Sequence, residues 1–125
     1  MGRVYAEITA EGKSLHTLFD PGAVHNYIIR KKKEGFLPYT LKKSFEIATG
    51  GERENIISAC LIDGEIQGNH LFYWAFVIDD LGLDEKGREI ELLLGVTEMQ
   101  RWNIKIDLQE EKLDLSRFRK EFIEY

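Results

Sequence analysis

The sequence Leu18-Phe19-Asp20-Pro21-Gly22-Ala23 sets a carboxylate at the point where an apolar segment ends in a turn. Pro presets the φ angle that a tight turn needs, and Gly tolerates the positive φ angles that other residues avoid. Taken alone, this hexapeptide predicts an ordinary turn between two elements. Whether Asp20 has a chemical role therefore depends on the segments around it.

The segments on either side of this turn predict a mainly β structure. Val4–Ala10 and Leu15–Phe19 are rich in residues that favour strands, and they flank the polar stretch 11–14, so they predict an opening hairpin. After the turn, the spacing of apolar residues over Val24–Glu34 predicts a short helix, and Gly35 stands where a helix-ending glycine is expected.

The middle of the chain predicts a second, longer hairpin. Residues 36–47 alternate imperfectly between apolar and polar, and residues 56–62 resume a strand pattern after a polar tip at 48–52. Asp63-Gly64 predicts a two-residue turn. The apolar run Leu71–Ile78 that follows is expected to be a strand buried on both faces.

A loop and a short helix are expected next. Residues 79–89 are polar and predict a loop, which leads into the apolar segment 90–95. Thr97 and Gln100 have the spacing of a capping box, so they predict a helix over Glu98–Trp102 with Thr97 as its N-cap. Asn103 is expected to end this helix.

The last third closes with a hairpin and a tail. Residues 104–108 alternate strictly and, together with Leu113–Leu115, predict a closing hairpin. In the tail, Phe118 and Phe122 are one helical turn apart, which predicts a short amphipathic helix over 116–125. Its apolar side would pack either on its own barrel or on a second subunit.

Composition excludes several classes of function. The 125 residues suit one domain, and a net charge of −5 argues against binding nucleic acid through bulk charge, so a peptide or a neutral ligand is expected. The longest apolar run, Leu71–Ile78, is far shorter than the roughly 20 residues of a membrane helix, so no contact with a membrane is expected. Cys60 has no second cysteine to pair with and no secretory signal is evident, which together predict a cytoplasmic protein.

The sequence carries no motif for a nucleotide, a cofactor or a metal ion. Glycine-rich phosphate-binding and dinucleotide-binding patterns are missing, as is a C-x-x-C pair, and His16, His25 and His70 are too scattered for a metal site. We expect no cofactor and no metal. No serine has the context of a nucleophile, so carboxylates remain as the candidates for chemistry.

Three features occur in order along the chain: an Asp-x-Gly-Ala turn after a second strand, a glycine-rich hairpin about 30 residues later, and an apolar pair followed by Gly and a short helix. From about Val4 to Leu115 the chain thereby resembles the retroviral-protease-like (retropepsin-type) aspartic peptidases, most of all the protease-like domain of ubiquitin-shuttle proteins and their prokaryotic relatives. The resemblance implies one peptidase domain over residues 1–115, with a tail over 116–125. It also implies a closed, mainly β barrel with one or two short helices.

The resemblance assigns roles to residues as well. Asp20 would be catalytic, in an active-site turn completed by Pro21, Gly22 and Ala23. The remaining residues that it implies are those of a flap that covers the substrate, Ala48, Thr49, Gly50 and Gly51, and those of a second signature, Leu93, Leu94 and Gly95.

The reaction implied by the resemblance needs two copies of the chain. Each chain of a homodimer would supply one Asp20 to a shared site on the two-fold axis. Two carboxylates about 3 Å apart cannot both ionise cheaply, so one keeps a proton while the other acts as a base. The ionised group would take a proton from a water as that water attacks a peptide carbonyl, and the protonated group would polarise the carbonyl oxygen. The expected substrate is a peptide or an unfolded polypeptide.

Pro21 departs from the Thr or Ser that the family has at this position. The hydroxyl and N–H of that residue lock the two active-site turns together across the dimer, and proline supplies neither group. Two functions therefore stay open: an active endopeptidase, or a weak or inactive dimer that binds peptides in the same groove. A third interpretation makes Asp20 part of a plain turn in a monomeric barrel without a catalytic role.

Overall fold

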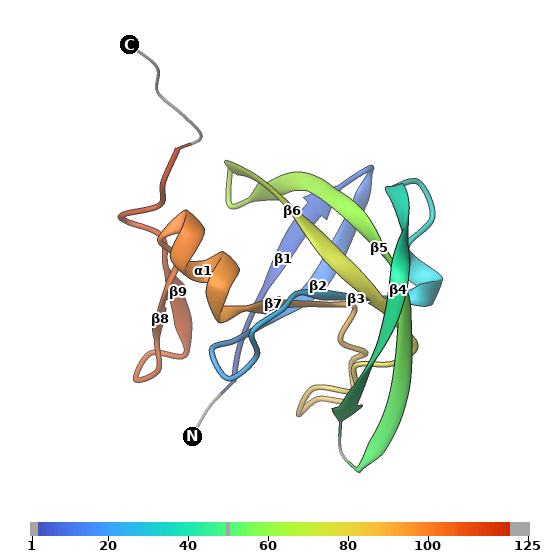
Figure 1. Cartoon of the computed structure of the whole chain (residues 1–125). Coiled ribbons are helices and arrows are strands. Elements are labelled where there is room, and N and C mark those ends of the chain that lie inside the picture. The colour runs from blue at the N-terminus through green and yellow to red at the C-terminus, as the bar shows by residue number, and fades with distance from the viewer. Residues whose placement is uncertain (1–2, 50, 121–125) are drawn as a thin grey trace.

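The computed structural model describes residues 3–49 and 51–120 and is built mainly from strands (Figure 1). A short 3-10 helix, η1, and an α-helix, α1, interrupt the strands. In chain order the elements are β1 (Val4–Ala10), β2 (Lys13–Asp20), β3 (Tyr27–Ile29), η1 (Arg30–Lys32), β4 (Leu37–Thr49), β5 (Glu52–Ile66), β6 (Asn69–Ile78), β7 (Leu92–Gly95), α1 (Val96–Trp102), β8 (Lys105–Asp107) and β9 (Lys112–Asp114).

Seven of these strands form one sheet that closes on itself. Its order is β1-β2-β7-β3-β6-β5-β4, and a further pairing of Thr9 in β1 with Glu65 in β5 joins the two sides into a barrel. β2 pairs with β7 in parallel and β3 with β6 in parallel, while the hairpin pairings are antiparallel. The expected mainly β barrel is confirmed, as are the opening hairpin β1–β2, the long hairpin β4–β5 and the closing hairpin β8–β9.

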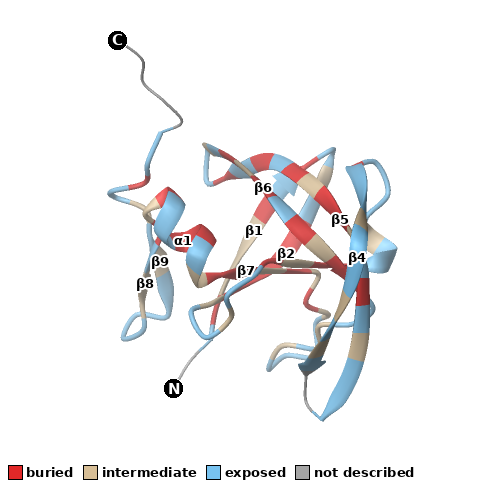
Figure 2. Cartoon of the chain, viewed as in Figure 1, coloured by how far each residue is buried: buried red, intermediate tan, exposed pale blue. Residues whose placement is uncertain are grey.

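The barrel is filled by apolar side chains from every strand of the closed part of the sheet. Ile8, Leu15, Ile62 and Leu92 have no exposed surface, and each such side chain contributes about 1.5–3 kcal/mol by leaving water. Figure 2 shows the buried positions concentrated on β1, β2, β5 and β6, whereas β4 is largely exposed. The core of the molecule therefore lies in the barrel, and the β4–β5 hairpin extends from it.

Gly64 does not form the turn that the sequence predicts, because β5 continues through it to Ile66. The turn lies instead at Gln67 and Gly68, whose φ angles are +49° and +83°. A Cβ on Gly64 would lie 2.4 Å from the carbonyl oxygen of Thr9 and 2.8 Å from the Cβ of Ala10. Gly64 is thus the place where β5 crosses β1 too closely for any side chain.

The helix predicted over Val24–Glu34 is wrong. Tyr27–Ile29 forms the short strand β3, which lies between β6 and β7, and only Arg30–Lys32 is helical, as a 3-10 turn. Ile28 and Ile29 are fully buried in this sheet, and a run of three apolar residues fits either a strand or a helix by its periodicity. Gly35 does take the positive φ angle expected of it, +91°.

The strand over Leu71–Ile78 is present as part of β6, but its expected burial on both faces is wrong. Trp74 is 47% exposed, while Tyr73 and Ala75 point into the barrel. β6 therefore has one inner and one outer face, as a strand of a barrel wall does.

The short helix α1 begins two residues earlier than predicted, at Val96. Gly95 is the N-cap residue, no side chain caps the helix, and Thr97 is an exposed residue of its first turn. The predicted role of Thr97 is therefore wrong. Asn103 ends the helix in the left-handed conformation, with φ +59°, as expected.

The tail is not helical over residues 116–120. Phe118 is nonetheless buried, with its ring stacked on Trp102 of α1 at a centroid distance of 5.7 Å. The tail thus packs on its own chain at this point. Phe122 lies outside the described residues.

Replacing Gly64 tests the crossing of β1 and β5. We expect Gly64→Ala to lower the free energy of unfolding by about 2 to 3 kcal/mol, because the new methyl group meets backbone atoms that cannot move independently. The matched control is Gly68→Ala, where no atom lies within 4 Å and only the positive φ angle costs about 1 kcal/mol. Urea denaturation of both variants measures the difference, and equal losses would contradict this account of the crossing.

Candidate active site

Asp20 is the last residue of β2 and lies at the rim of the barrel. Its backbone carbonyl accepts a hydrogen bond from the N–H of Ala23 at 3.1 Å, which closes the turn. Its side-chain Oδ1 accepts the N–H of Gly22 at 2.8 Å, so the carboxylate bends back over the turn. Asp20 is half-buried, whereas Pro21 and Gly22 are exposed. The turn therefore presents a carboxylate with a fixed orientation.

Gly95 is brought directly against this turn. In the parallel pairing of β2 with β7, Asp20 lies opposite Gly95. A Cβ on Gly95 would lie 2.6 Å from the carbonyl oxygen of His25 and 2.7 Å from that of Ala23, and the N–H of Val96 donates to the latter at 2.7 Å. The last residue of the second predicted signature is thus a glycine, because two backbone segments cross at this position. Leu94 is buried in the barrel, and Leu93 is half-buried.

A buried polar network supports the crossing, and the sequence did not predict it. The Asn26 side chain accepts the N–H of Gly95 at 2.9 Å and donates to the carbonyl of Trp74 at 3.1 Å and to Glu98 Oε1 at 3.2 Å. The other oxygen of Glu98 accepts the indole N–H of Trp102 at 2.8 Å. Asn26 and Glu98 are 7% and 8% exposed, so these bonds form where lost partners are costly.

Only part of this network had a signal in the sequence. Glu98 lies within the capping-box pattern, but that pattern predicts a role for Thr97 instead, and Asn26 lies in the segment that the sequence predicts to be a helix. Tyr73, in the core near this network, has a pKa well above its usual range because of burial, with the charge of Glu98 adding to the effect.

The β4–β5 hairpin stands where the flap was predicted. Thr49 pairs with Glu52 and Ala48 with Arg53, so the strands run to the tip, where Gly51 has a φ angle of +85°. Gly50 lies outside the described residues. The pairing shifts its register between Thr40 and Phe45. This irregularity bends the hairpin away from the barrel wall (Figure 1).

A groove lies between the end of this hairpin and the loop that follows β6. It has a volume of about 570 Å³. One salt bridge fixes its edge, because Arg30 Nε lies 2.8 Å from Asp79 Oδ1, and the N–H of Asp79 donates to Glu54 at 2.8 Å. The residues that line it are Glu52, Arg53, Glu54, Asp79, Asp80, Leu81, Gly82 and Leu93.

Pro21 borders a second, more apolar recess of about 410 Å³. Val96, Ile106 and Leu108 line it together with Pro21, and Leu108 is 54% exposed. The turn after Asp20 therefore adjoins exposed apolar surface from β8 and the segment behind it.

Within residues 3–49 and 51–120, no group of three His, Cys, Asp or Glu side chains is arranged to hold a metal ion. Over the same part of the chain, no helix has both the length and the apolar character needed to cross a bilayer.

The closed barrel, the Asp20 turn and the crossing at Gly95 together define a fold of the retroviral-protease-like class. Among solved structures, the chain is similar to the retroviral protease-like domain of Ddi1 from Leishmania major, with a TM-score of 0.69 and 18% sequence identity. The similarity covers 99% of this chain and 96% of that one, so the whole fold is shared. No protein-family model and no curated protein matches the chain.

The buried network gives a prediction for stability. We expect Glu98→Ala to lower the free energy of unfolding by about 3 kcal/mol, because the donors of Asn26 and Trp102 lose their acceptor inside the protein. The neighbouring Thr97→Ala is the control and should change it by less than about 0.5 kcal/mol, since Thr97 is exposed and caps nothing. Thermal or urea denaturation measures both, and a large effect of Thr97→Ala would restore it as the cap.

Proposed function

We propose that this chain is a homodimeric aspartic endopeptidase in which each copy contributes Asp20 to one shared site. The observation that carries the proposal is the orientation of the Asp20 carboxylate, held on an exposed turn at the crossing with Gly95 in a fold of the retroviral-protease-like class. Among the described residues, Oδ1 has Gly22 as its partner and Oδ2 has no hydrogen-bond partner. An oxygen without a partner in its own chain is what a shared site requires of each half.

In the proposed site the two Asp20 carboxylates approach closely and hold one proton between them, because two adjacent negative charges repel each other. The ionised Asp20 accepts a proton from a water molecule, whose oxygen attacks the carbonyl carbon of the peptide bond. The protonated Asp20 donates a hydrogen bond to the carbonyl oxygen. The tetrahedral intermediate then breaks at the C–N bond as the nitrogen is protonated, with no covalent bond to the enzyme.

The peptide is proposed to lie extended beneath the β4–β5 hairpin, which acts as a flap with Ala48, Thr49, Gly50 and Gly51 at its tip. Backbone groups of a substrate can pair with such a hairpin as an added strand. The groove between this hairpin and residues 79–82 has the room for side chains of the substrate. These features support a polypeptide as the ligand.

Pro21 favours a second candidate function, a dimer that binds peptides and cuts them weakly or not at all. Pro21 is exposed on the turn and has neither an N–H nor a hydroxyl with which to hold a second copy. Catalysis requires that reacting groups be held to within about 0.5 Å, whereas binding tolerates looser geometry. The two candidates share the groove and differ in the chemistry.

We propose a reducing compartment, the cytoplasm, as the place of action. Cys60 is buried, and burial raises the pKa of its thiol to about 11, so it is an unreactive core residue.

A cleavage assay separates the two candidates. We expect the native chain to cut unfolded polypeptides or peptides at some pH between about 3 and 7, and Asp20→Asn to lower kcat/KM by about 10³-fold or more. Undiminished cleavage by Asp20→Asn would rule out the mechanism. If only Pro21→Thr cuts, the native chain is the peptide-binding dimer.

Assembly is a separate prediction. Sedimentation at micromolar concentration should give twice the mass of the 14.5 kDa chain, because the proposed site needs an Asp20 from each of two copies. A mass of one chain at every concentration tested, with no cleavage, would identify Asp20 as part of a plain turn.

A further inference from the structure

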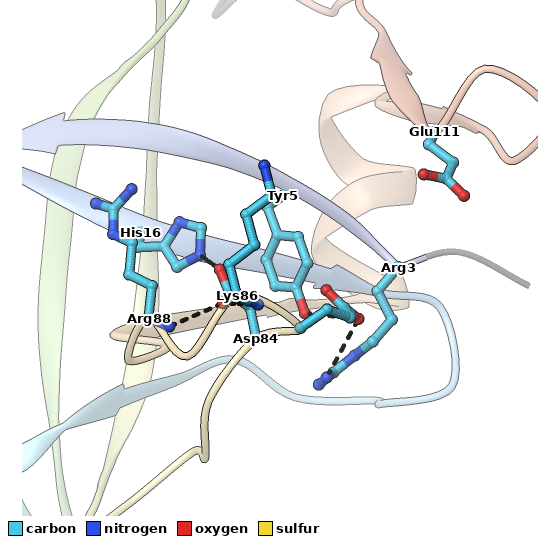
Figure 3. Close-up of a pocket in the computed structure, with 8 residues that line it drawn as sticks. Arg3, Tyr5, His16, Asp84, Lys86, Arg88 and Glu111 are labelled. Carbon is cyan, nitrogen blue, oxygen red and sulfur yellow. Dashed lines mark hydrogen bonds and ion pairs between the residues drawn. The ribbon is translucent and has the colours of Figure 1, made fainter.

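His16 of β2 is a buried histidine that the proposed reaction does not use. It lies in a pocket on the side of the barrel, with Nε2 2.8 Å from Asp84 Oδ2 (Figure 3). Its other ring nitrogen, Nδ1, lies 3.2 Å from Glu7 Oε2, and the ring stacks on Tyr5 at a centroid distance of 4.9 Å. Only 6% of the residue is exposed. A carboxylate therefore faces each nitrogen of a ring that water hardly reaches.

Asp84 also holds together the segment that joins β6 to β7, residues 79–91 (the 79–91 loop). Its Oδ1 accepts the backbone N–H groups of Lys86 and Arg88, each at 2.9 Å. At the end of the loop, the N–H of Glu91 donates to the carbonyl of His16 at 2.9 Å, and the Glu91 carboxylate accepts the N–H of His16 at 2.7 Å. The loop is thus held to β2 at Asp84 and at Glu91.

The part of the loop that is held to β2, residues 84–91, is connected to the part that lines the groove, residues 79–82. The N–H of Ile90 donates to the carbonyl of Gly82 at 2.9 Å, and Leu83 forms an isolated bridge with Glu89. Gly82 and Leu81 line the groove under the β4–β5 hairpin. Backbone contacts therefore link the part of the loop that is held at His16 to this wall of the groove.

The contacts of His16 depend on its protonation. A neutral imidazole has one N–H donor and one acceptor, so it can satisfy only one of two facing carboxylates, whereas the imidazolium donates to both. The cluster thus closes fully when His16 carries a proton. The titratable and charged groups that face His16 are Glu7 and Tyr5 of β1 and Asp84, Arg88 and Glu91 of the 79–91 loop. The other charged residues that line the same pocket are Arg3, Glu85, Lys86 and Glu111.

Both carboxylates stay ionised into acidic solution. Partial burial acts to raise the pKa of Glu7, but hydrogen bonds from Ser14, His16 and Arg88 outweigh it, so the pKa is lowered. The backbone N–H of Arg88 does most to lower the pKa of Asp84, and His16 adds to it. Contacts with such carboxylates are lost only as the pH falls through the lowered pKa. In mildly acidic solution both carboxylates are therefore ionised and able to accept hydrogen bonds from the ring.

We propose that His16, Asp84 and Glu7 form a positioning clamp that fixes the 79–91 loop as one wall of the peptide groove, and that protonation of His16 closes it. The inference rests on the proposed function for the identity of the groove. None of the three residues touches the reacting atoms of the proposed mechanism. The clamp acts on substrate binding, through the loop.

Amide hydrogen exchange on the native chain tests the clamp without reference to activity. Protection factors of the Arg88 and Ile90 amides should be about tenfold higher at about pH 5 than at about pH 8. Asp84→Asn keeps an oxygen for the loop amides and places an NH₂ group opposite the ring, so it should remove this pH dependence. The control Glu85→Gln changes an exposed neighbour outside the clamp and should behave as the native chain. If protection of these amides in the native chain does not change with pH, the proposal is overturned.

Peptide kinetics test the connection to the groove. Asp84→Asn should raise KM several-fold at about pH 5 with kcat within about twofold of native, since the clamp positions the wall and not the reacting groups. Loss of protection with an unchanged KM would overturn the proposal. If the native chain cuts no peptide, the endopeptidase proposal fails, but the clamp is still decided by the Ile90 amide, which donates to the Gly82 carbonyl at the wall of the groove. Protection of that amide that Asp84→Asn leaves unchanged would overturn the clamp.

Discussion

The structure depends on the close approach of Gly95 to the backbone of Ala23 and His25. Because no side chain separates them, β7 can pair with β2 and still pass under the turn that carries Asp20. The Asn26 side chain then satisfies the N–H of Gly95 and links it to Glu98 in α1. Burying the Glu98 carboxyl group at this point has a high desolvation cost. Hydrogen bonds to both of its oxygens offset this cost.

The barrel and the groove differ in how firmly they are held. Barrel strands bury apolar side chains on their inner face, while β4 and the 79–91 loop are mostly exposed (Figure 2). Segments with few buried contacts open more easily than a core does, and binding surfaces are commonly drawn from them. Polar contacts such as those of Asp79 with Arg30 and Asp84 with His16 take the place of a core in this region.

Some local signals in the sequence predict the structure well, whereas the Asp63-Gly64 turn and the Thr97 cap are wrong. The hairpins, the Asp20 turn and Gly95 follow from alternation, glycine placement and the order of short motifs. The sequence predicts a helix where β3 lies because three apolar residues have no distinct period, and only its neighbours β6 and β7 decide its conformation. Asn26 and Glu98 could not be paired from the sequence, since their contact joins segments 72 residues apart.

The bracing of the Asp20 turn lies wholly within one copy of the chain, as do the barrel core and the stacking of Phe118 on Trp102. For the proposed homodimer, each half would then fold without needing contacts from a second copy. For the proposed enzyme, the working concentration of the chain would then act as its switch: dilute molecules stay intact and silent, and raising their abundance creates activity without refolding.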